Sequence, residues 1–384
     1  MMLGYLLARR GVDVVVVEKH GDFLRDFRGD TVHPSTLAVL DELDLLERFL
    51  TRPHQELRHV SVQIGERRFR VADFGRVRTR CRFIAFMPQW DFLDFIAEEA
   101  RHLPHFRLLM STEATRLLTR EGRVTGVRAT GPDGEVRLHA QLVVAADGRH
   151  SILRRQAGLK VMDIGAPIDV LWFRVGREGD DVEQTFGRVD AGRFMITIDR
   201  GDYWQCAYVI RKGAAGALKA GPIAAFKQAV AAAAPYLAPR IDDLGTWDDV
   251  KLLSVSVDRL ERWSQPGLLC IGDAAHAMSP VGGVGINMAI QDAVATANLL
   301  AGTLARREAP TRADLEAVRR RRLLPTRITQ AFQVLVQNRV LLPVLQRQAF
   351  KVPLIVRMLD RLPVLQALPA RFIGIGIRPE HIDR

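Results

Sequence analysis

The segment GDAAHAMSPVGGVGINMAIQDA, residues 272–293, carries residue types suited to holding a flat ligand. It begins at the end of a predicted buried strand, where Gly272 permits close backbone approach and Asp273 offers an acceptor for hydroxyl groups. Pro280 stiffens the loop that follows. Three glycines would let the backbone lie flat against a planar ring: Gly282, Gly283 and Gly285.

Ile286 and Asn287 open the helix predicted after this loop. The first amide groups of a helix have no partner within it and lie at the positive end of its dipole. A helix start therefore stabilises an anion by the physics that binds phosphate. A reduced flavin carries negative charge around its N1 and C2 carbonyl, so the segment predicts a site for such a ring.

Three predicted buried strands each end in an acidic residue: Glu18, Asp147 and Asp273. In open parallel sheets, ligands bind beyond the carboxyl ends of the strands. A carboxylate there can accept hydrogen bonds from ribose or ribityl hydroxyls. Gly148 and Gly272 stand beside two of these acids, which favours a ligand site. For Asp147, a role in a turn or a helix cap is the alternative.

No side chain stands out as catalytic, and His276 and Pro280 are the candidates within the loop. Imidazole titrates near neutrality, but a hydrogen-bonded structural histidine is the stronger interpretation of His276, as of His33. No Ser/His/Asp or Cys/His signature is recognisable.

The elements around these residues predict a βαβ unit that lacks its first half. MMLGYLLARRG reads as an apolar helix ending at Gly11. VDVVVVEKH follows, and the run from Val14 to Val17 predicts a parallel strand buried on both faces. A strand and a tight loop should precede the helix. We expect a truncated or misassigned start; the alternative is a fold without that strand.

Residues 168–210 alternate with the period of strands and predict a separate antiparallel sheet. Its aromatic residues are candidates to line a substrate pocket, although alternation sends neighbours to opposite faces, so that only about half can do so. Ordinary sheet packing is the alternative for each. The candidates retained for the pocket are Trp172, Phe194 and Tyr203.

The composition is that of a globular protein of two domains or one large interleaved unit, with 384 residues and a net charge of +11. No nucleic-acid-binding motif accompanies the charge, and the run from Arg319 to Arg322 predicts a solvated helix face. Cys81, Cys206 and Cys270 lie far apart, which predicts reduced thiols in a cytosolic protein and no metal site.

Residues 321–384 predict a basic, apolar, helical tail that prolines cut into short pieces. The stretch KVPLIVRMLDRLPVLQALPARFIGIGI mixes arginines with bulky apolar residues, as interfacial segments do. We expect the tail to pack against the rest of the protein; peripheral contact with the inner face of the membrane is the alternative. No run is long enough for a spanning helix, and both a monomer and a homodimer stay open.

Taken together, these segments resemble the p-hydroxybenzoate hydroxylase-like monooxygenases, a family that includes the ubiquinone-biosynthesis hydroxylases. GDAAH…P…GxGxN resembles the second FAD motif of that family, and ADGRHS, residues 146–151, resembles its middle DG motif, which contacts FAD and NAD(P)H. VVVVEKH, with Glu18 and Lys19, is similar to the end of its first βαβ unit. FRGDTVHPSTL supplies Arg28, and PQWDFLDFI supplies a flavin-contacting glutamine, Gln89.

The resemblance implies an α/β fold, α+β overall, in which a Rossmann-like FAD-binding domain is interleaved with an antiparallel substrate-binding sheet. The family opens with strand–GxGxxG–helix, and that glycine loop is absent from this sequence. The implied division is residues 1–56, 85–155 and 253–320 for FAD, 57–84 and 156–252 for substrate, and 321–384 for the helical tail.

The resemblance also implies an activity. NADH or NADPH would reduce FAD, dioxygen would add to form a flavin C4a-hydroperoxide, and one oxygen atom would pass to an aromatic or quinone-like small molecule. The alternatives are a flavin-dependent reductase on the same fold and a truncated, non-catalytic binding protein.

Overall fold

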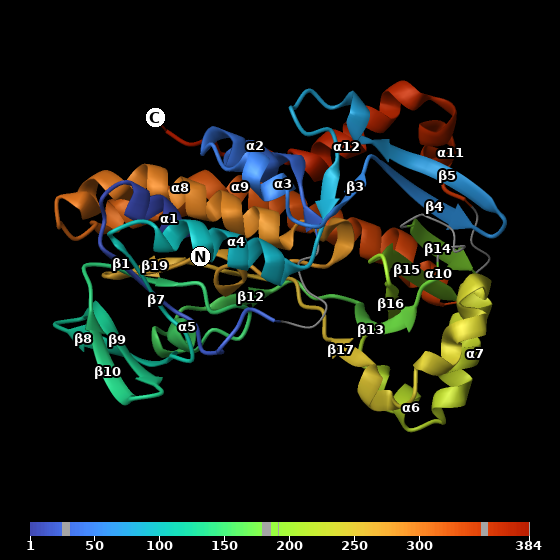
Figure 1. Ribbon diagram of the computed structural model, residues 1–384, viewed down its shortest axis with the longest axis horizontal. Helices are drawn as coiled ribbons and strands as arrows, with labels where there is room; N and C mark the ends of the chain where they lie inside the picture. The colour runs from blue at the N-terminus through green and yellow to red at the C-terminus, as the bar shows by residue number, and fades with distance from the viewer. Residues whose placement is uncertain (25–30, 179–185, 191, 347–351, 384) are drawn as a thin grey trace.

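The computed structural model describes residues 1–24, 31–178, 186–190, 192–346 and 352–383. Figure 1 shows two long helices, α8 (Gly285–Ala305) and α9 (Arg312–Val336), lying along the molecule between groups of strands. Parallel strand pairs, antiparallel sheets and a helical C-terminal region occur together. The predicted fold class is therefore confirmed.

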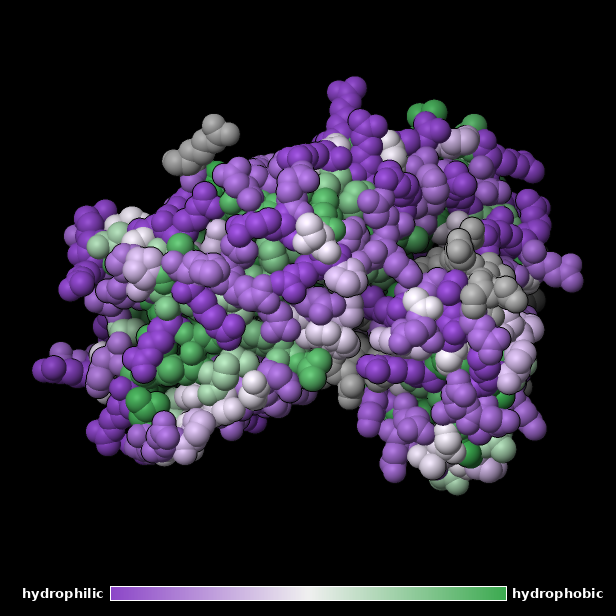
Figure 2. Space-filling view, in the orientation of Figure 1, coloured by the Kyte–Doolittle hydropathy of each residue, from purple (hydrophilic) through white to green (hydrophobic). Residues whose placement is uncertain are grey.

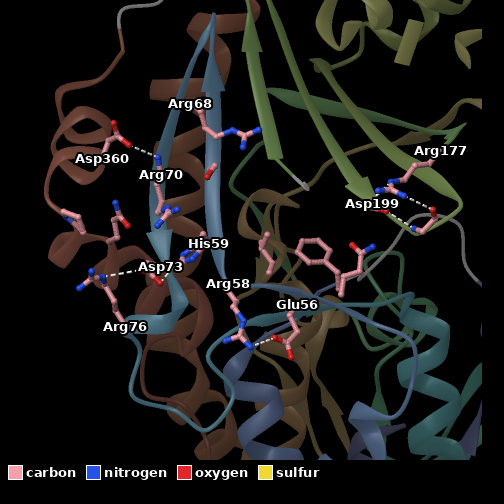
Figure 3. Close-up of a pocket in the computed structure, with 17 residues that line it drawn as sticks. Glu56, Arg58, His59, Arg68, Arg70, Asp73, Arg76, Arg177, Asp199 and Asp360 are labelled. Carbon is pink, nitrogen blue, oxygen red and sulfur yellow. Dashed lines mark hydrogen bonds and ion pairs between the residues drawn. The ribbon is translucent and has the colours of Figure 1, made fainter. Parts of the chain in front are cut away.

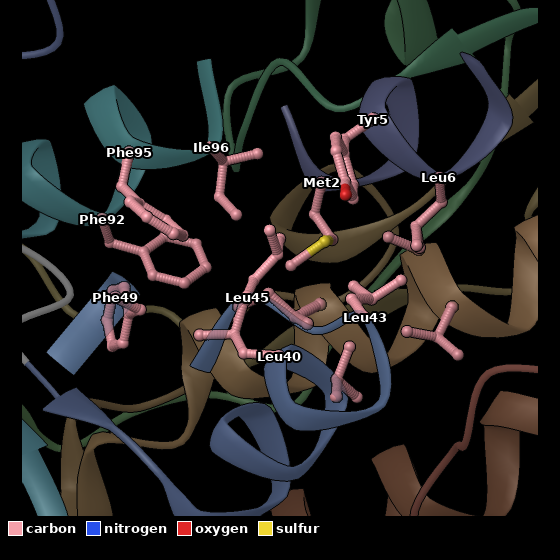
Figure 4. Packing of buried hydrophobic residues seen from close by; sticks show 14 of the residues in the cluster. Met2, Tyr5, Leu6, Leu40, Leu43, Leu45, Phe49, Phe92, Phe95 and Ile96 are labelled. Carbon is pink, nitrogen blue, oxygen red and sulfur yellow. The ribbon is translucent and has the colours of Figure 1, made fainter. Parts of the chain in front are cut away.

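Helix α1 (Met2–Arg9) packs against α8 and α4 (Gln89–Arg101). Glycine is required at position 4, because a Cβ atom there would lie 2.8 Å from the side chain of Val16. Gly11 follows the helix with a φ of +75°, as expected of a C-terminal glycine. Helices α2 (Pro34–Glu42) and α3 (Leu46–Leu50) complete the cluster. Figure 4 shows the core that these helices share: Met2, Tyr5, Leu6, Leu40, Leu43, Leu45, Phe49, Phe92, Phe95 and Ile96.

Two short groups of parallel strands precede the predicted strand-end acids. Strand β1 (Val14–Val17) pairs with β7 (Phe106–Leu109), and β11 (Val143–Ala145) pairs with β20 (Leu268–Cys270). The antiparallel strand β19 (Ser264–Gln265) completes the second group. Within the described residues, β1 and β11 each pair along one edge.

The prediction that Val14 to Val17 is buried on both faces is wrong. Val15 is 45% exposed, and the other three valines are half-buried. β1 has β7 on one side, and its valines line a cavity that Val144 and Ala145 of β11 also line. An edge strand leaves part of its surface uncovered, which accounts for the incomplete burial.

Smaller antiparallel groups surround these strands. Residues 113–139 form a three-stranded antiparallel sheet, with a turn at Gly122 whose φ is +75°. The strands of these groups are β8 (Glu113–Arg120), β9 (Arg123–Gly131) and β10 (Gly134–His139); β2 (Thr31–Val32), β6 (Ile84–Phe86) and β3 (Gln55–Leu57); and β12 (Val161–Asp163) with β18 (Asp258–Leu260).

A seven-stranded sheet forms the other half of the molecule, and its neighbours are antiparallel except for β14 and β4. Helix α7 (Ile223–Ala233) packs Phe226 against Phe173 and Tyr208 of this sheet. Residues 59–73 form an antiparallel hairpin that turns at Gly65. The strands, in order across the sheet, are β17 (Lys251–Leu253), β13 (Ile168–Gly176), β16 (Tyr203–Arg211), β15 (Arg193–Asp199), β14 (Phe186–Asp190), β4 (His59–Ile64) and β5 (Arg67–Asp73).

The C-terminal region continues from α9 without a break at residue 320, so the predicted domain boundary falls inside this helix. A π-helical turn, Gln337–Leu341, leads from α9 into α10. No helix in the described ranges combines the length and apolar character needed to span a bilayer. The remaining helices are α5 (Ile152–Gln156), α6 (Ala215–Lys219), α10 (Leu342–Leu345), α11 (Leu354–Arg361) and α12 (Ala367–Gly374).

The arginine run of α9 is only partly the solvated face that was predicted. Arg320 is exposed, and Arg319 forms an ion pair with Glu316 at 2.6 Å. Arg322 is fully buried and lies 2.8 Å from Asp292 of α8. A buried aspartate therefore requires one of the four arginines to point inward, which charge patterning alone does not reveal.

Candidate cofactor and substrate site

A cavity with a volume of 1830 Å³ runs from the strand-end acids to the seven-stranded sheet. It brings together most of the predicted site residues, although they come from segments far apart in the sequence. The predicted residues that line it are Glu18, Lys19, Gln89, Asp147, Gly148, Trp172, Phe194, Gly272, Asp273, Pro280, Gly283, Gly285 and Ile286.

Three of the predicted residues that the structure describes are not among those lining the cavity. Arg28 lies outside the described residues. His276 and Asn287 are buried behind the loop that forms the cavity wall. Tyr203 is the first residue of β16, and the guanidinium of Arg174 lies 4.8 Å from the centre of its ring.

The loop before α8 is glycine-rich because neighbouring residues approach its backbone closely. Gly283 has a φ of +63°, and a Cβ atom there would lie 2.5 Å from Oγ1 of Thr31. That hydroxyl donates to the carbonyl of Gly283 at 2.8 Å. Gly272 has a φ of +57°, and its Cβ would lie 3.0 Å from that of Ala289. Larger residues at either glycine would move the cavity wall.

The N-terminus of α8 points its first amide groups toward this loop. The first intrahelical bond runs from the amide of Met288 to the carbonyl of Val284, so the amides of Gly285, Ile286 and Asn287 have no partner within the helix. No described side chain caps them. Because Gly285 and Ile286 line the cavity, the helix presents donors and positive dipole charge there.

The side chain of Asn287 holds this helix start against β2. Its Oδ1 accepts from the amide of His33 at 2.9 Å and from the hydroxyl of Thr36 at 2.8 Å. Its Nδ2 donates to the carbonyls of Thr31 and Gly283 at 3.0 and 3.3 Å. Asn287 therefore positions the loop and leaves ligand contact to the backbone.

Asp292, one turn further along α8, is the centre of a buried polar network. It accepts from Gly272 N at 3.0 Å, lies 2.6 Å from Nε2 of His276, and accepts from Nε of Arg322 at 2.8 Å. Burial raises the pKa of Asp292, but the charge and hydrogen bonds of His276 and Arg322 outweigh burial and lower it. His276 is thus a structural partner of Asp292.

The strand-end acids also have structural partners. Glu18 accepts from the amide of His20 at 3.0 Å. Asp147 accepts from the amide of Ile152 at 3.0 Å and so caps α5, while still lining the cavity. Asp273 lies 3.6 Å from the guanidinium of Arg149, another lining residue. Carboxylates that already accept hydrogen bonds keep free lone pairs for ligand hydroxyls.

The seven-stranded sheet supplies an apolar wall. Trp172 and Phe194 line the cavity together with Ile196 and Val209. Phe173, the neighbour of Trp172, points to the other face and is fully buried in the core beside α7. The strand period therefore divides the predicted aromatic residues between cavity and core, as alternation requires.

A second cavity, of 1010 Å³, adjoins the first and shares Leu57, Ser61 and Phe86 with it. Figure 3 shows that charged side chains of both signs surround it. Arg177 pairs with Asp199 at 3.2 Å, and Arg76 pairs with Asp73 at 3.1 Å. Because both positive and negative groups line it, the second cavity is a polar extension of the main cavity with little net charge.

The residues present suit FAD. Its ribityl and ribose hydroxyls need acceptors, its planar ring needs a flat backbone surface, and the anionic edge of the ring needs amide donors. Asp273 and Glu18, the loop around Gly283, and the start of α8 meet these needs in one cavity. The arrangement fits this cofactor better than a metal, because no group of metal-ligating side chains occurs in the described residues.

Sequence reasoning missed three residues of this site. Thr31 fixes Gly283, Arg149 pairs with Asp273, and Asp292 organises the loop from behind. Asp292 could have been found, because it is the one acidic residue within an otherwise apolar stretch of α8. Thr31 and Arg149 gave no such signal, since surface loops often contain threonine and arginine.

The cavity suits FAD, and comparison with known proteins shows that the chain is an enzyme of the FAD-dependent monooxygenase class. Residues 1–331 match the family described as FAD binding domain, and the chain belongs to that family. Its relatives include the 6-methylpretetramide 4-monooxygenase of Streptomyces rimosus, which is 32% identical over 97% of this chain and 88% of the relative. FAD is accordingly the cofactor.

Other relatives extend well beyond the matched region. The dialkyldecalin synthase of Streptomyces rugosporus is 26% identical over 79% of this chain and 63% of its own length. Among solved structures, the p-nitrophenol 4-monooxygenase PnpA of Pseudomonas putida DLL-E4 has a TM-score of 0.77 at 20% identity, with 98% of this chain and 95% of that chain covered. The latter similarity concerns the fold.

Proposed function

We propose that the protein uses NADH or NADPH and dioxygen to hydroxylate an aromatic or quinone-like small molecule of the polyketide type. The observation that carries this proposal is the single cavity joining the FAD-type wall to the apolar wall of the sheet. Its 1830 Å³ exceeds what one drug-sized ligand of at most about 1,000 Å³ needs. It therefore has room for a cofactor and a ring-shaped substrate together.

Within this proposal, the chain positions and shields the reacting groups. The loop around Gly283 and Gly285 supports the ring, the start of α8 stabilises its anionic edge, and Asp273 holds the ribityl chain. Bound FAD would supply the activation of dioxygen. Gln89, Lys19 and Gly148 are proposed as further cofactor contacts, since they line the same cavity.

The substrate would lie against Trp172 and Phe194. Apolar walls remove water from the reacting centre, which favours oxygen transfer to the substrate over loss of the activated oxygen to water. No acid or base from the protein is required by this scheme, and His276 is buried against Asp292 away from the cavity. Pro280 lines the cavity and shapes the loop.

The name of the 6-methylpretetramide 4-monooxygenase supports the substrate class, since it denotes oxygenation of a polycyclic compound. Two other functions stay open: a flavin-dependent reductase on the same fold, and a binding protein without redox activity.

The test begins with the visible spectrum of the purified chain, before and after addition of FAD. A yellow protein that consumes NADH or NADPH and dioxygen with a polycyclic phenol, and adds a hydroxyl group to it, supports the proposal. Cofactor oxidation with a reduced product and no oxygen uptake would indicate the reductase. A protein that is still colourless after incubation with excess FAD and removal of the unbound FAD would indicate the binding protein.

A matched pair of variants ties the result to the site. Asp273→Asn should weaken FAD binding about tenfold, because one charge-assisted hydrogen bond is lost. Asp133→Asn, on an exposed turn, should leave it unchanged. Equal FAD affinity in the two variants would contradict the assignment of Asp273.

A further inference from the structure

Helix α11, the turn after it and the start of α12 carry the densest set of exposed apolar side chains in the described part of the chain. Six large apolar residues there are between 42% and 80% exposed, within 15 positions of sequence. Soluble proteins rarely leave such a group uncovered, and a contiguous one marks an interaction site. We call this set the α11 face: Leu354, Ile355, Met358, Leu362, Val364 and Leu368.

Around the axis of α11, the exposed apolar residues, the residues that pack against β5 and the arginines lie on different sides. At about 100° per residue, Leu354, Ile355 and Met358 fall within one arc of about 100°. Val356 and Leu359 are half-buried on the side that packs against β5. Figure 1 shows α11 on the outside of the molecule beside β5, and Figure 2 shows hydrophobic residues at that corner of the surface.

The exposed charged side chains of residues 352–378 are all arginines. Arg357 and Arg361 lie along one flank of the apolar arc and are exposed, and Arg371 is exposed on α12. The one acidic residue from 352 to 378, Asp360, is half-buried and accepts from the backbone amide of Arg70 at 3.0 Å. Its carboxylate is thus tied to β5 and faces away from the apolar arc.

We infer that the α11 face docks on an anionic membrane surface. An apolar arc flanked by arginines is the pattern of helices that lie in the lipid interface, where the apolar side enters the acyl boundary and the guanidinium groups reach the phosphates. Anionic lipids add an attraction for each arginine near the surface. The net charge of +11 acts in the same direction.

A second copy of the chain is a poorer occupant. A twofold contact through this face would bring together Arg357 and Arg361 of both copies. Among the described residues of the face, no exposed acidic side chain is present to pair with them. Like charges at a desolvated contact disfavour association, whereas lipid phosphates neutralise them.

The test is flotation of the full chain with vesicles of phosphatidylcholine alone or mixed with phosphatidylglycerol. The wild-type protein should float with the mixed vesicles and bind at least tenfold less to the neutral ones. Leu354→Glu combined with Ile355→Glu should abolish flotation. The matched control is Leu218→Glu, an exposed leucine on α6 with the same chemistry, which should float like the wild type.

A second pair of variants isolates the electrostatic part. Arg357→Gln with Arg361→Gln should weaken binding to the mixed vesicles about tenfold while the thermal midpoint stays unchanged, because both side chains are exposed. Flotation of the Leu354/Ile355 double variant as strong as that of the wild type would overturn the inference, since binding would then reflect net charge alone. A wild-type dimer in sedimentation that the same variant dissociates would also overturn it.

Discussion

The two ends of the main cavity are built in different ways. At the end formed by the loop before α8, Asn287 and Asp292 fix the backbone through buried hydrogen bonds and ion pairs. At the end around Glu18, β1 is an edge strand with an exposed valine, and α1 begins at the cavity wall. The contrast indicates that the end formed by the loop before α8, which we call the ring-binding end, has its shape before any ligand binds.

Buried polar networks of this kind are stiff because a partial network is costlier than none. Removing one member leaves charged or polar groups without partners in a medium that solvates them poorly. An edge strand has no such dependence, since water satisfies its free groups. Substitutions at the two ends should therefore differ strongly in their effect on stability.

The largest effect is expected for Asp292→Ala. It leaves Arg322 and His276 buried without their common partner, and breaking a buried ion pair costs about 3–5 kcal/mol. Urea unfolding measures the loss. Asp314→Ala, which removes an exposed capping carboxylate of α9, is the control and should cost about 1 kcal/mol or less. Equal losses for the two variants would show that the network is dispensable.

Asn287→Ala should cost about 2–3 kcal/mol, because the amide of His33 and the hydroxyl of Thr36 lose a buried acceptor. FAD affinity should fall as well, since the carbonyl of Gly283 loses its contact with Nδ2. Asn298→Ala, at a less buried position of the same helix, should cost under about 1 kcal/mol and leave FAD affinity unchanged. If Asn287→Ala binds FAD as tightly as the wild type, then the side chain of Asn287 does not contribute to the cofactor site.

Acidification should destabilise the same end through His33. Burial lowers the pKa of His33 to about 4, although its contact with the carbonyl of Ile373 raises it, whereas the unfolded chain has a pKa of about 6.5. Above pH 6.5 the imidazole is neutral in both states. Below that pH the imidazole of the unfolded chain binds a proton, whereas the buried imidazole of the folded chain stays neutral. The free energy of unfolding therefore falls until the pH reaches about 4.

Between pH 7 and pH 5, this histidine should account for a loss of about 2 kcal/mol in the free energy of unfolding. His33→Gln removes that part of the pH dependence, whereas His102→Gln, at an exposed position, keeps it. Parallel pH curves for wild type and His33→Gln in urea titrations would contradict the buried neutral imidazole.

Much of the ring-binding end could be predicted from the sequence because its constraints are local. Gly283, Gly285 and Asp273 lie in one segment, and the need for a flat backbone and an acceptor is visible in residue types. The role of Asn287 was harder to predict, since a helix-start residue was expected to offer its amide. Its side chain turns inward because His33 and Thr36 need an acceptor there.

The features that the sequence could not predict depend on contacts between residues that are far apart in the chain. Arg322 belongs to a run of arginines and is buried because two acidic residues far away in the chain, Asp292 and Glu380, pair with it. Alternation predicted that some aromatic residues face the cavity but could not choose Trp172 over Tyr203. The exposure of Val15 follows from the pairing of β1 along one edge, which a run of valines does not disclose.

The smallest effect is expected at the end of the cavity around Glu18, where β1 is an edge strand. Val15→Thr should change the free energy of unfolding by less than about 0.5 kcal/mol, because a hydroxyl on a 45% exposed side chain stays hydrated. The same substitution at fully buried Val294 of α8 should cost about 1–3 kcal/mol, since the hydroxyl loses water without gaining a partner. Urea titrations of the two variants give the comparison directly. If Val15→Thr costs as much as Val294→Thr, then another strand covers β1 in solution, and the two ends of the cavity are equally closed.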